Sequence, residues 1–299
     1  MTNTYIDCIA YSKQPTGLVL STYIGNMARI GTTALGTTSL TVPALTVALN
    51  QYDSVYVFDG SSSEELQVGA AGAIIGATSI PLLNPTAFAH TSGTPYCTDG
   101  TSGSLGEQIF TASKWIEDDI CFQALWSTAY TSETLTMPTM RAAIDNQGNV
   151  HFRPRHFPIA SVSTITLQDA RKIQYPMDQT QAIIDSDQQT VDISLSALSS
   201  TQSQVQQGYP WYGRIGRNTT AWIILGYTAG FSTLPTTVRR ACTLLTSECF
   251  VQLENPIGAD QINQGKRQVQ FMLRGDTSGE SLLVKQAKSL LQAYIAESF

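Results

Sequence analysis

Charge is scarce in this sequence. Only 13% of its 299 residues are Asp, Glu, Lys or Arg, about half of the roughly 25% that is usual in globular proteins. Ser, Thr, Gln and Gly make up the difference. The hydrophobic fraction of 42% is ordinary, so the low charge does not indicate disorder. The composition indicates a β-rich chain with a neutral surface, which neighbouring subunits of an assembly could cover.

Basic clusters are also missing. The net charge is −6, and residues 1–104 hold two basic and six acidic side chains. Without a patch of Lys or Arg, direct affinity for nucleic-acid phosphate is not expected. No apolar run reaches the roughly 18 residues that mark a membrane-spanning helix. We therefore expect neither specific nucleic-acid binding nor a membrane partner.

Sequence motifs for catalysis and metal binding are absent as well. The five cysteines form no C-x-x-C pair, and Cys242 and Cys249 fall on one apolar helical stripe, as buried free thiols in a reducing compartment do. The three histidines lack the spacing of a zinc site. The acidic clusters at 64–65 and 117–119 lack the alternating ligands of a calcium loop. No phosphate-binding loop, nucleophile elbow or dinucleotide fingerprint occurs, so we expect no enzyme activity, no metal and no cofactor.

The clearest local pattern lies at residues 221–249. Residues 221–225 are apolar, β-branched or aromatic, which is typical of a buried strand. Gly226 and Gly230 flank the tripeptide Tyr-Thr-Ala and supply positions where positive φ is readily adopted. Pro235 then leads into a helix. Four residues at helical spacing predict that one face of this helix is buried: Val238, Cys242, Leu245 and Cys249.

This order of strand, Tyr-Thr-Ala-Gly turn, proline and apolar helix resembles the head–tail connector (adaptor) proteins of tailed phages. The segment Phe-Arg-Pro-Arg-His-Phe-Pro at 152–158, before a Ser-Val strand, resembles the same family. The helix expected at 109–121 takes the place of the family's first core helix. The resemblance covers residues 105–299, with an echo at 5–20.

The resemblance implies a virion protein of the neck, assembled in the host cytoplasm. Family members form a ring, usually of twelve copies, that docks on the portal protein through a C-terminal segment. The ring extends the DNA channel without binding the genome specifically, and it supports tail, stopper or other neck proteins.

The expected fold class is α+β, a small helical and β connector core with an additional all-β barrel or sandwich near the N-terminus. The domains predicted are an N-terminal arm at 1–29, the small all-β domain at 30–98, the connector core at 99–253 and a C-terminal docking segment with a terminal helix at 254–299. Strands are expected at 54–58, 65–68, 133–137, 149–153, 160–168, 190–195, 221–227 and 266–271, and helices at 109–121, 236–253 and 280–297.

Segment 30–98 contains a weak internal repeat. Residues 36–40 and 76–80 are similar and lie forty positions apart. Family cores are shorter than this chain, so the segment is additional. The alternative to a connector is therefore that residues 30–98 form a virion-associated module that binds carbohydrate or a host surface.

The candidate site residues are interface residues, since no catalytic or metal site is predicted. The arginines around Pro154 either pair with carboxylates of a partner or end a surface strand. Aromatic residues in the Ser/Gln-rich stretch 197–218 either anchor an interface or cover the edge of the core. The apolar stripe of the last helix packs on the portal or on its own subunit. The candidates are Arg153, Arg155, Tyr209, Trp211, Tyr212, Leu283, Leu290, Leu291 and Tyr294.

Overall fold

The structure is a computed structural model. It describes residues 3–14, 20–137, 139, 141–145, 149–169, 172–185, 189–197, 221–254, 261–264, 267–270 and 281–296. The chain divides into two compact units. Unit 1 is Met1–Phe122 with Leu234–Ile295, and unit 2 is Gln123–Thr233 with Ala296–Phe299. Helices and antiparallel sheets are both present, which confirms the α+β class, and no sheet in the described part closes into a barrel.

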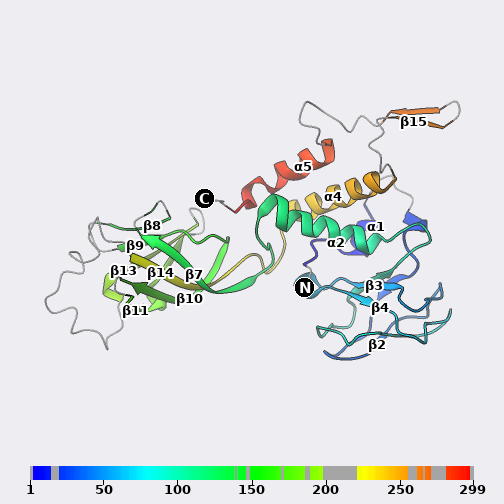
Figure 1. The fold of residues 1–299 in the computed structure, drawn as a ribbon, viewed down its shortest axis with the longest axis horizontal. Coiled ribbons are helices and arrows are strands. Elements are labelled where there is room, and N and C mark those ends of the chain that lie inside the picture. Colours follow the sequence, from blue (N-terminus) through cyan, green and yellow to red (C-terminus); the bar gives the residue numbers. More distant parts are fainter. Residues whose placement is uncertain are drawn as a thin grey trace. The chain divides into compact units, whose positions relative to one another are not determined.

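Unit 1 contains the α-helices of the described part, which Figure 1 shows in blue, green, orange and red. They are α1 (Cys8–Ser12), α2 (Leu105–Trp115) with the π-helical turn η3 (Ile116–Cys121), α4 (Thr236–Glu254) and α5 (Leu282–Leu291) with the 3₁₀ turn η7 (Gln292–Tyr294). Helix α4 packs between α2 and α5. The predicted stripes are buried on both α2–η3 and α4, so hydrophobic periodicity located this core correctly.

The predicted N-terminal arm is part of that core. The side chains of Tyr5, Cys8 and Tyr11 are at most 1% exposed. The Tyr11 ring stacks on Phe250 of α4, and its hydroxyl lies 2.9 Å from the Ser247 hydroxyl. A buried tyrosine with a partner for its hydroxyl adds substantial apolar contact, which explains why this segment folds onto the helices.

The remainder of unit 1 is the β domain. Its four-stranded sheet has the order β1-β6-β3-β4, and a two-stranded sheet pairs β2 with β5. The strands are β1 (Met27–Arg29), β2 (Ser39–Thr41), β3 (Ser54–Val57), β4 (Glu64–Gln67), β5 (Ser79–Pro81) and β6 (Pro95–Thr98), with 3₁₀ turns η1 (Leu20–Thr22) and η2 (Gly60–Ser62). The β3–β4 pair confirms the predicted hairpin. The sheet also packs on α2, where a Cβ on Gly106 would lie 2.2 Å from the Tyr56 ring.

The weak sequence repeat is an internal pseudo-two-fold. Leu40 of β2 pairs with Ile80 of β5 in an antiparallel ladder, so the two repeat copies contact each other. The sheet order β1-β6-β3-β4 is unchanged when the halves β1–β3 and β4–β6 are exchanged. Backbone hydrogen bonds recur in matching pairs: Gly36 N to Thr86 O with Gly76 N to Leu45 O, and Val42 N to Thr78 O with Leu82 N to Thr38 O.

Unit 2 consists of two four-stranded antiparallel sheets around one core. The first has the order β11-β10-β14-β7 and the second β12-β13-β9-β8. The strands are β7 (Thr128–Met137), β8 (Ala142–Ile144), β9 (Asn149–Phe152), β10 (Ile159–Gln168), β11 (Gln174–Met177), β12 (Ile183–Asp185), β13 (Thr190–Ser194) and β14 (Ala221–Ala229), with 3₁₀ turns η4 (Gln179–Gln181) and η5 (Leu195–Ala197). All five strands predicted in this stretch are present.

The predicted connector core, 99–253, is thus shared by both units, because its helices lie in unit 1 and its strands in unit 2. Segment 30–98 lies wholly inside unit 1. In the predicted C-terminal segment, β15 (Gln261–Gln264) pairs with β16 (Arg267–Gln270), in agreement with the strand expected at 266–271.

Candidate functional sites

The first candidate interface is the segment around Pro154 in unit 2. Arg153 is partly buried, and its Nη2 donates to Gln189 Oε1 at 3.2 Å. Arg155 is exposed, while its backbone N–H donates to Glu133 Oε1 at 2.9 Å. The Arg155 side chain is therefore on the surface, at a position that its backbone holds fixed.

Glu133 of β7 is the centre of that arrangement. Its carboxylate accepts hydrogen bonds from Arg141 Nη2 at 3.1 Å, from the Arg155 backbone and from the Tyr227 hydroxyl of β14. The Tyr227 hydroxyl also accepts from the His156 backbone N–H at 3.3 Å. Glu133 thus joins β7, β14 and the segment that follows β9. We call this group the Glu133 clamp.

Aromatic stacking completes the clamp. The Tyr130 ring stacks on His156 at 4.0 Å between centroids and on Tyr227 at 5.2 Å. Burial lowers the pKa of His156, so its neutral form is favoured. Burial and the hydrogen bond to Glu133 both raise the pKa of Tyr227, which keeps the phenol protonated. The arrangement holds the protons in place and is suited to positioning rather than to proton transfer.

His151 on β9 has a different environment from His156. Its Nδ1 lies 2.6 Å from Asp192 Oδ1 and its Nε2 lies 3.2 Å from Asp145 Oδ2. The hydrogen bond to Asp192 is the main reason that the pKa of His151 is raised. His151 and His156 thus have separate partners.

The second candidate interface is α5. Val284, Ala287 and Leu291 are at most 4% exposed, and α5 packs on α4 of the same chain. Leu283, Leu290 and Tyr294 are partly buried. Part of the apolar stripe therefore packs on its own subunit. Val284 is not among the predicted candidates, although its position one turn before Ala287 fits the same periodicity.

Polar contacts fix α5 further. Ser281 caps its N-terminus and also donates to Glu248 Oε2 of α4 at 2.7 Å, and the Tyr294 hydroxyl lies 3.0 Å from Thr237 Oγ1. The exposed apolar residues near α5 are Leu282 and Ile295, at 48% and 37%.

The third group of candidates, Tyr209, Trp211 and Tyr212, lies outside the described residues.

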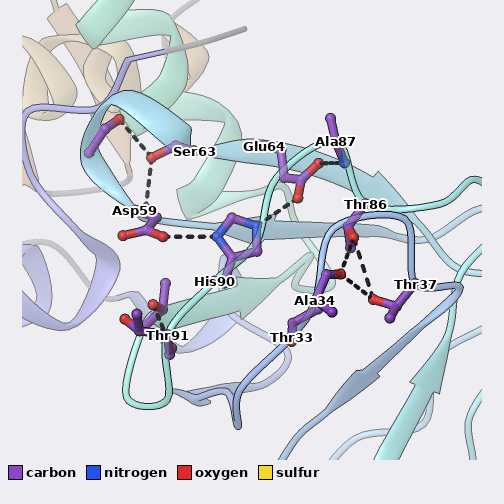
Figure 2. A network of polar contacts seen from close by, with 12 residues as sticks. Thr33, Ala34, Thr37, Asp59, Ser63, Glu64, Thr86, Ala87, His90 and Thr91 are labelled. Atoms are coloured by element: carbon purple, nitrogen blue, oxygen red, sulfur yellow. Dashed lines mark hydrogen bonds and ion pairs between the residues drawn. The ribbon is translucent and has the colours of Figure 1, made fainter.

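A polar cluster that the sequence did not predict lies in the β domain (Figure 2). His90 has no exposed side-chain surface; its Nδ1 is 3.0 Å from Asp59 Oδ2 and its Nε2 is 2.6 Å from Glu64 Oε1. The other Glu64 oxygen accepts the Ala87 N–H at 2.8 Å. Ser63 accepts the Asp59 N–H at 2.8 Å. We call this the His90 cluster.

Both ring nitrogens of His90 face carboxylate oxygens. A neutral imidazole has one N–H, so two hydrogen bonds require either the imidazolium or a protonated carboxyl group. A positive ring between two carboxylates satisfies all three groups in a buried place. The sequence did contain a signal for this cluster. Residues 66–98 include no Asp, Glu, Lys or Arg, and His90 is the one histidine among them.

The pseudo-two-fold shows what the cluster replaces. His90 exchanges two backbone hydrogen bonds with Thr33, as Leu49 does with Ala73, so Leu49 is the counterpart of His90.

Asn26 and Glu64 are counterparts in the same way. Asn26 Oδ1 accepts the N–H groups of Thr46 and Val47 at 2.8 and 3.0 Å, as Glu64 accepts that of Ala87. Each half thus uses one buried oxygen-bearing side chain to bind the loop after its middle strand.

Groups able to carry chemistry do not converge elsewhere in the described residues. No set of three His, Cys, Asp or Glu side chains is placed to hold a metal ion. All five cysteines are buried and free, and burial raises the pKa of Cys242 to about 11 and that of Cys249 to about 12. In the described part, no helix has the length and apolarity needed to cross a membrane.

Fold and clusters together define an α+β protein of two units whose buried polar groups hold loops and strands in place. No protein-family model matches the chain, and no curated protein matches it significantly.

Proposed function

We propose that this chain is a structural subunit of the head–tail connector ring of a tailed phage. The proposal rests on the sequence resemblance described above and on one structural observation, which is that the two motifs carrying the resemblance meet. The segment 152–158 and the turn 227–230 are far apart in the sequence. The Glu133 clamp joins them, and the Gly230 N–H donates to Pro158 O at 2.9 Å.

The glycine of the Tyr-Thr-Ala-Gly turn is required by this geometry. Gly230 has φ 102°, and a Cβ there would lie 2.3 Å from Trp126 O. A side chain at this position would be strained by the backbone conformation and would collide with the neighbouring backbone at Trp126. The motif therefore has a structural reason in this chain, which supports reading it as more than a chance match.

The path of the chain also supports the proposal. Helices α2 and α4 pack together although residues 123–233 of unit 2 lie between them in sequence. The chain of unit 1 is thus interrupted by an inserted sheet unit. This arrangement suits a ring subunit, in which one unit contacts neighbouring copies and the other reaches a different partner. The net charge of −6 suits a DNA channel, since an acidic wall does not retain phosphate.

Within this proposal, Arg155 is the portal-facing candidate that is best placed. Its side chain is exposed while its backbone is fixed by Glu133. Docking through α5 would have to use the side that contains Leu282, because α4 covers Leu291. The alternative function, a separate binding module at 30–98, has less support, because its sheet packs on α1 and α2 within unit 1.

The decisive experiment is imaging of particle necks with this subunit labelled. A labelled ring beneath the portal supports the proposal, and label elsewhere on the particle, or none, refutes it. In purified form we expect a monomer or weak oligomer, because a ring contact between copies can need the portal as a template. Sedimentation velocity that finds stable closed rings of pure protein at micromolar concentration would contradict that expectation.

Co-sedimentation with purified portal tests the residue. Arg155→Glu should weaken binding, whereas Arg240→Glu, at an arginine on α4 that is also exposed, should not. Equal binding by both variants removes Arg155 from the interface without deciding the function.

A further inference from the structure

The pseudo-two-fold of the β domain gives it two equivalent ends. Strands β2 and β5 are antiparallel, so the start of one lies beside the end of the other. The turn before β2 is bonded to Thr86, after β5, and the turn before β5 is bonded to Leu45, after β2. The turns at 34–37 and 74–77 therefore lie at opposite ends of the two-stranded sheet. We call them end A and end B.

Both ends expose large apolar side chains. At end A, Leu35 is 66% exposed and Leu83 is 42% exposed. At end B, Ile74 and Ile75 are 78% and 65% exposed, and Val47 is 45% exposed. Backbone hydrogen bonds between 45–49 and 73–77 bring Val47 to the same end as the isoleucines. Grouped exposure of this kind marks an interaction surface, unlike single scattered apolar residues.

Neither end contains a charged residue. Residues 30–52 and 66–98 include no Asp, Glu, Lys or Arg. Copies of a chain with net charge −6 repel one another, so contact between copies is least opposed where charge is missing. An acidic or basic partner would gain nothing from these ends. This favours a second copy of the same chain as the occupant.

We propose that end A of one copy binds end B of the next. A contact of A with A alone, or of B with B alone, would leave one apolar end exposed on every copy. Head-to-tail contact covers both ends of each copy, and such a heterologous contact generates a ring when the rotation closes. The proposal rests on the proposed function only for ring closure; contact between copies follows from the two ends themselves.

Disulfide trapping of the full-length protein tests the contact. The five native cysteines are buried, so new surface thiols at Leu35→Cys and Ile75→Cys are the ones that react under mild oxidation. The control pair is Gln51→Cys and Ser92→Cys, two exposed positions that are related by the same pseudo-two-fold but lie outside the two ends. Circular dichroism of each variant confirms that it is folded.

The double variant Leu35→Cys/Ile75→Cys should give a ladder of multimers, formed about tenfold faster than with the control pair because the contact raises the local thiol concentration. An equal mixture of the two single variants should give dimers that contain one of each, and no larger species.

Two results would overturn the proposal. One is crosslinking no faster than that of the control pair, and the other is rapid dimer formation by a single variant alone. Neither outcome bears on the proposed function, since no portal is present. A labelled neck ring together with failed trapping would leave the connector in place and remove this contact.

Discussion

Replacing His90 by leucine should destabilise the β domain markedly. The variant removes the ring that lies between Glu64, whose side chain is 9% exposed, and Asp59, whose side chain is 35% exposed. Asp59 can be rehydrated, whereas Glu64 is left as a buried carboxylate that still accepts the Ala87 N–H. Removing one partner of a buried ion pair costs about 3–5 kcal/mol. Because Asp59 is partly hydrated, we expect His90→Leu to lower the free energy of unfolding by about 3 kcal/mol.

The other half of the domain supplies the rescue. Where one half has His90 and Glu64, the other has Leu49 and Asn26. The double variant His90→Leu/Glu64→Asn therefore copies a solution that this fold already uses. Its new amide should bind the Ala87 N–H as Asn26 binds those of its own loop, and no buried carboxylate remains. We expect the double variant to recover to within about 1 kcal/mol of the wild type.

Urea unfolding and hydrogen exchange measure the effect. A chain of two units does not guarantee a two-state transition, so exchange of the Ala87 amide reports the stability of the loop directly. The single variant Glu64→Asn completes a double-mutant cycle with His90→Leu and the double variant. The reasoning fails if His90→Leu lies within about 0.5 kcal/mol of the wild type, the range typical of surface substitutions. It also fails if the double variant is as unstable as the single one.

Three further outcomes follow. Leu245→Asp should unfold unit 1, because a buried unpaired carboxylate costs several kcal/mol, whereas Arg240→Asp on the exposed side of α4 should leave the melting temperature nearly unchanged; equal melting temperatures would refute the helix packing. Leu291→Ala should lower the stability of the α4–α5 pair by about 2–5 kcal/mol in urea unfolding, and no loss would return α5 to the role of a free docking helix. In NMR titrations His151 should titrate above pH 6.5 and His156 below it, and matching midpoints would contradict this. The stability that protonated His151 contributes is therefore lost as pH rises through its pKa. The stability that neutral His156 contributes is lost as pH falls through its pKa.

Much of the secondary structure followed from local pattern. Period-3.6 stripes located α2 and α4, and alternating or fully apolar runs located the strands of unit 2, because burial on one face requires that spacing. The units were harder to predict, because sequence order placed the helices and strands of 99–253 together. Only packing shows that α4 returns to α2 after the strands. The packing of the N-terminal arm could not be predicted for a similar reason, since Tyr5 and Tyr11 give no sign in sequence of what they pack on.

The candidate site could be predicted only in part. Sequence spacing singled out Arg153 and Arg155, but Glu133 and Tyr227, which fix that segment, lie on strands that become neighbours only in the folded sheet. The stripe on α5 was correctly identified as apolar. Whether this stripe packs on a partner or on its own subunit depends on a surface of α4 that no local pattern describes.

The His90 cluster shows most clearly why a symmetric fold can be hidden in its sequence. Counterparts in the two halves are separated by 38 residues for Asn26 and Glu64, by 40 for Leu40 and Ile80, and by 41 for Leu49. No single offset aligns the halves, so only the middle part looks like a repeat. What both halves share is a physical requirement, a side-chain oxygen to bind the backbone N–H groups of a buried loop. An amide meets it alone, whereas a buried carboxylate needs a counter-charge, so Glu64 requires a histidine where the other half needs only leucine.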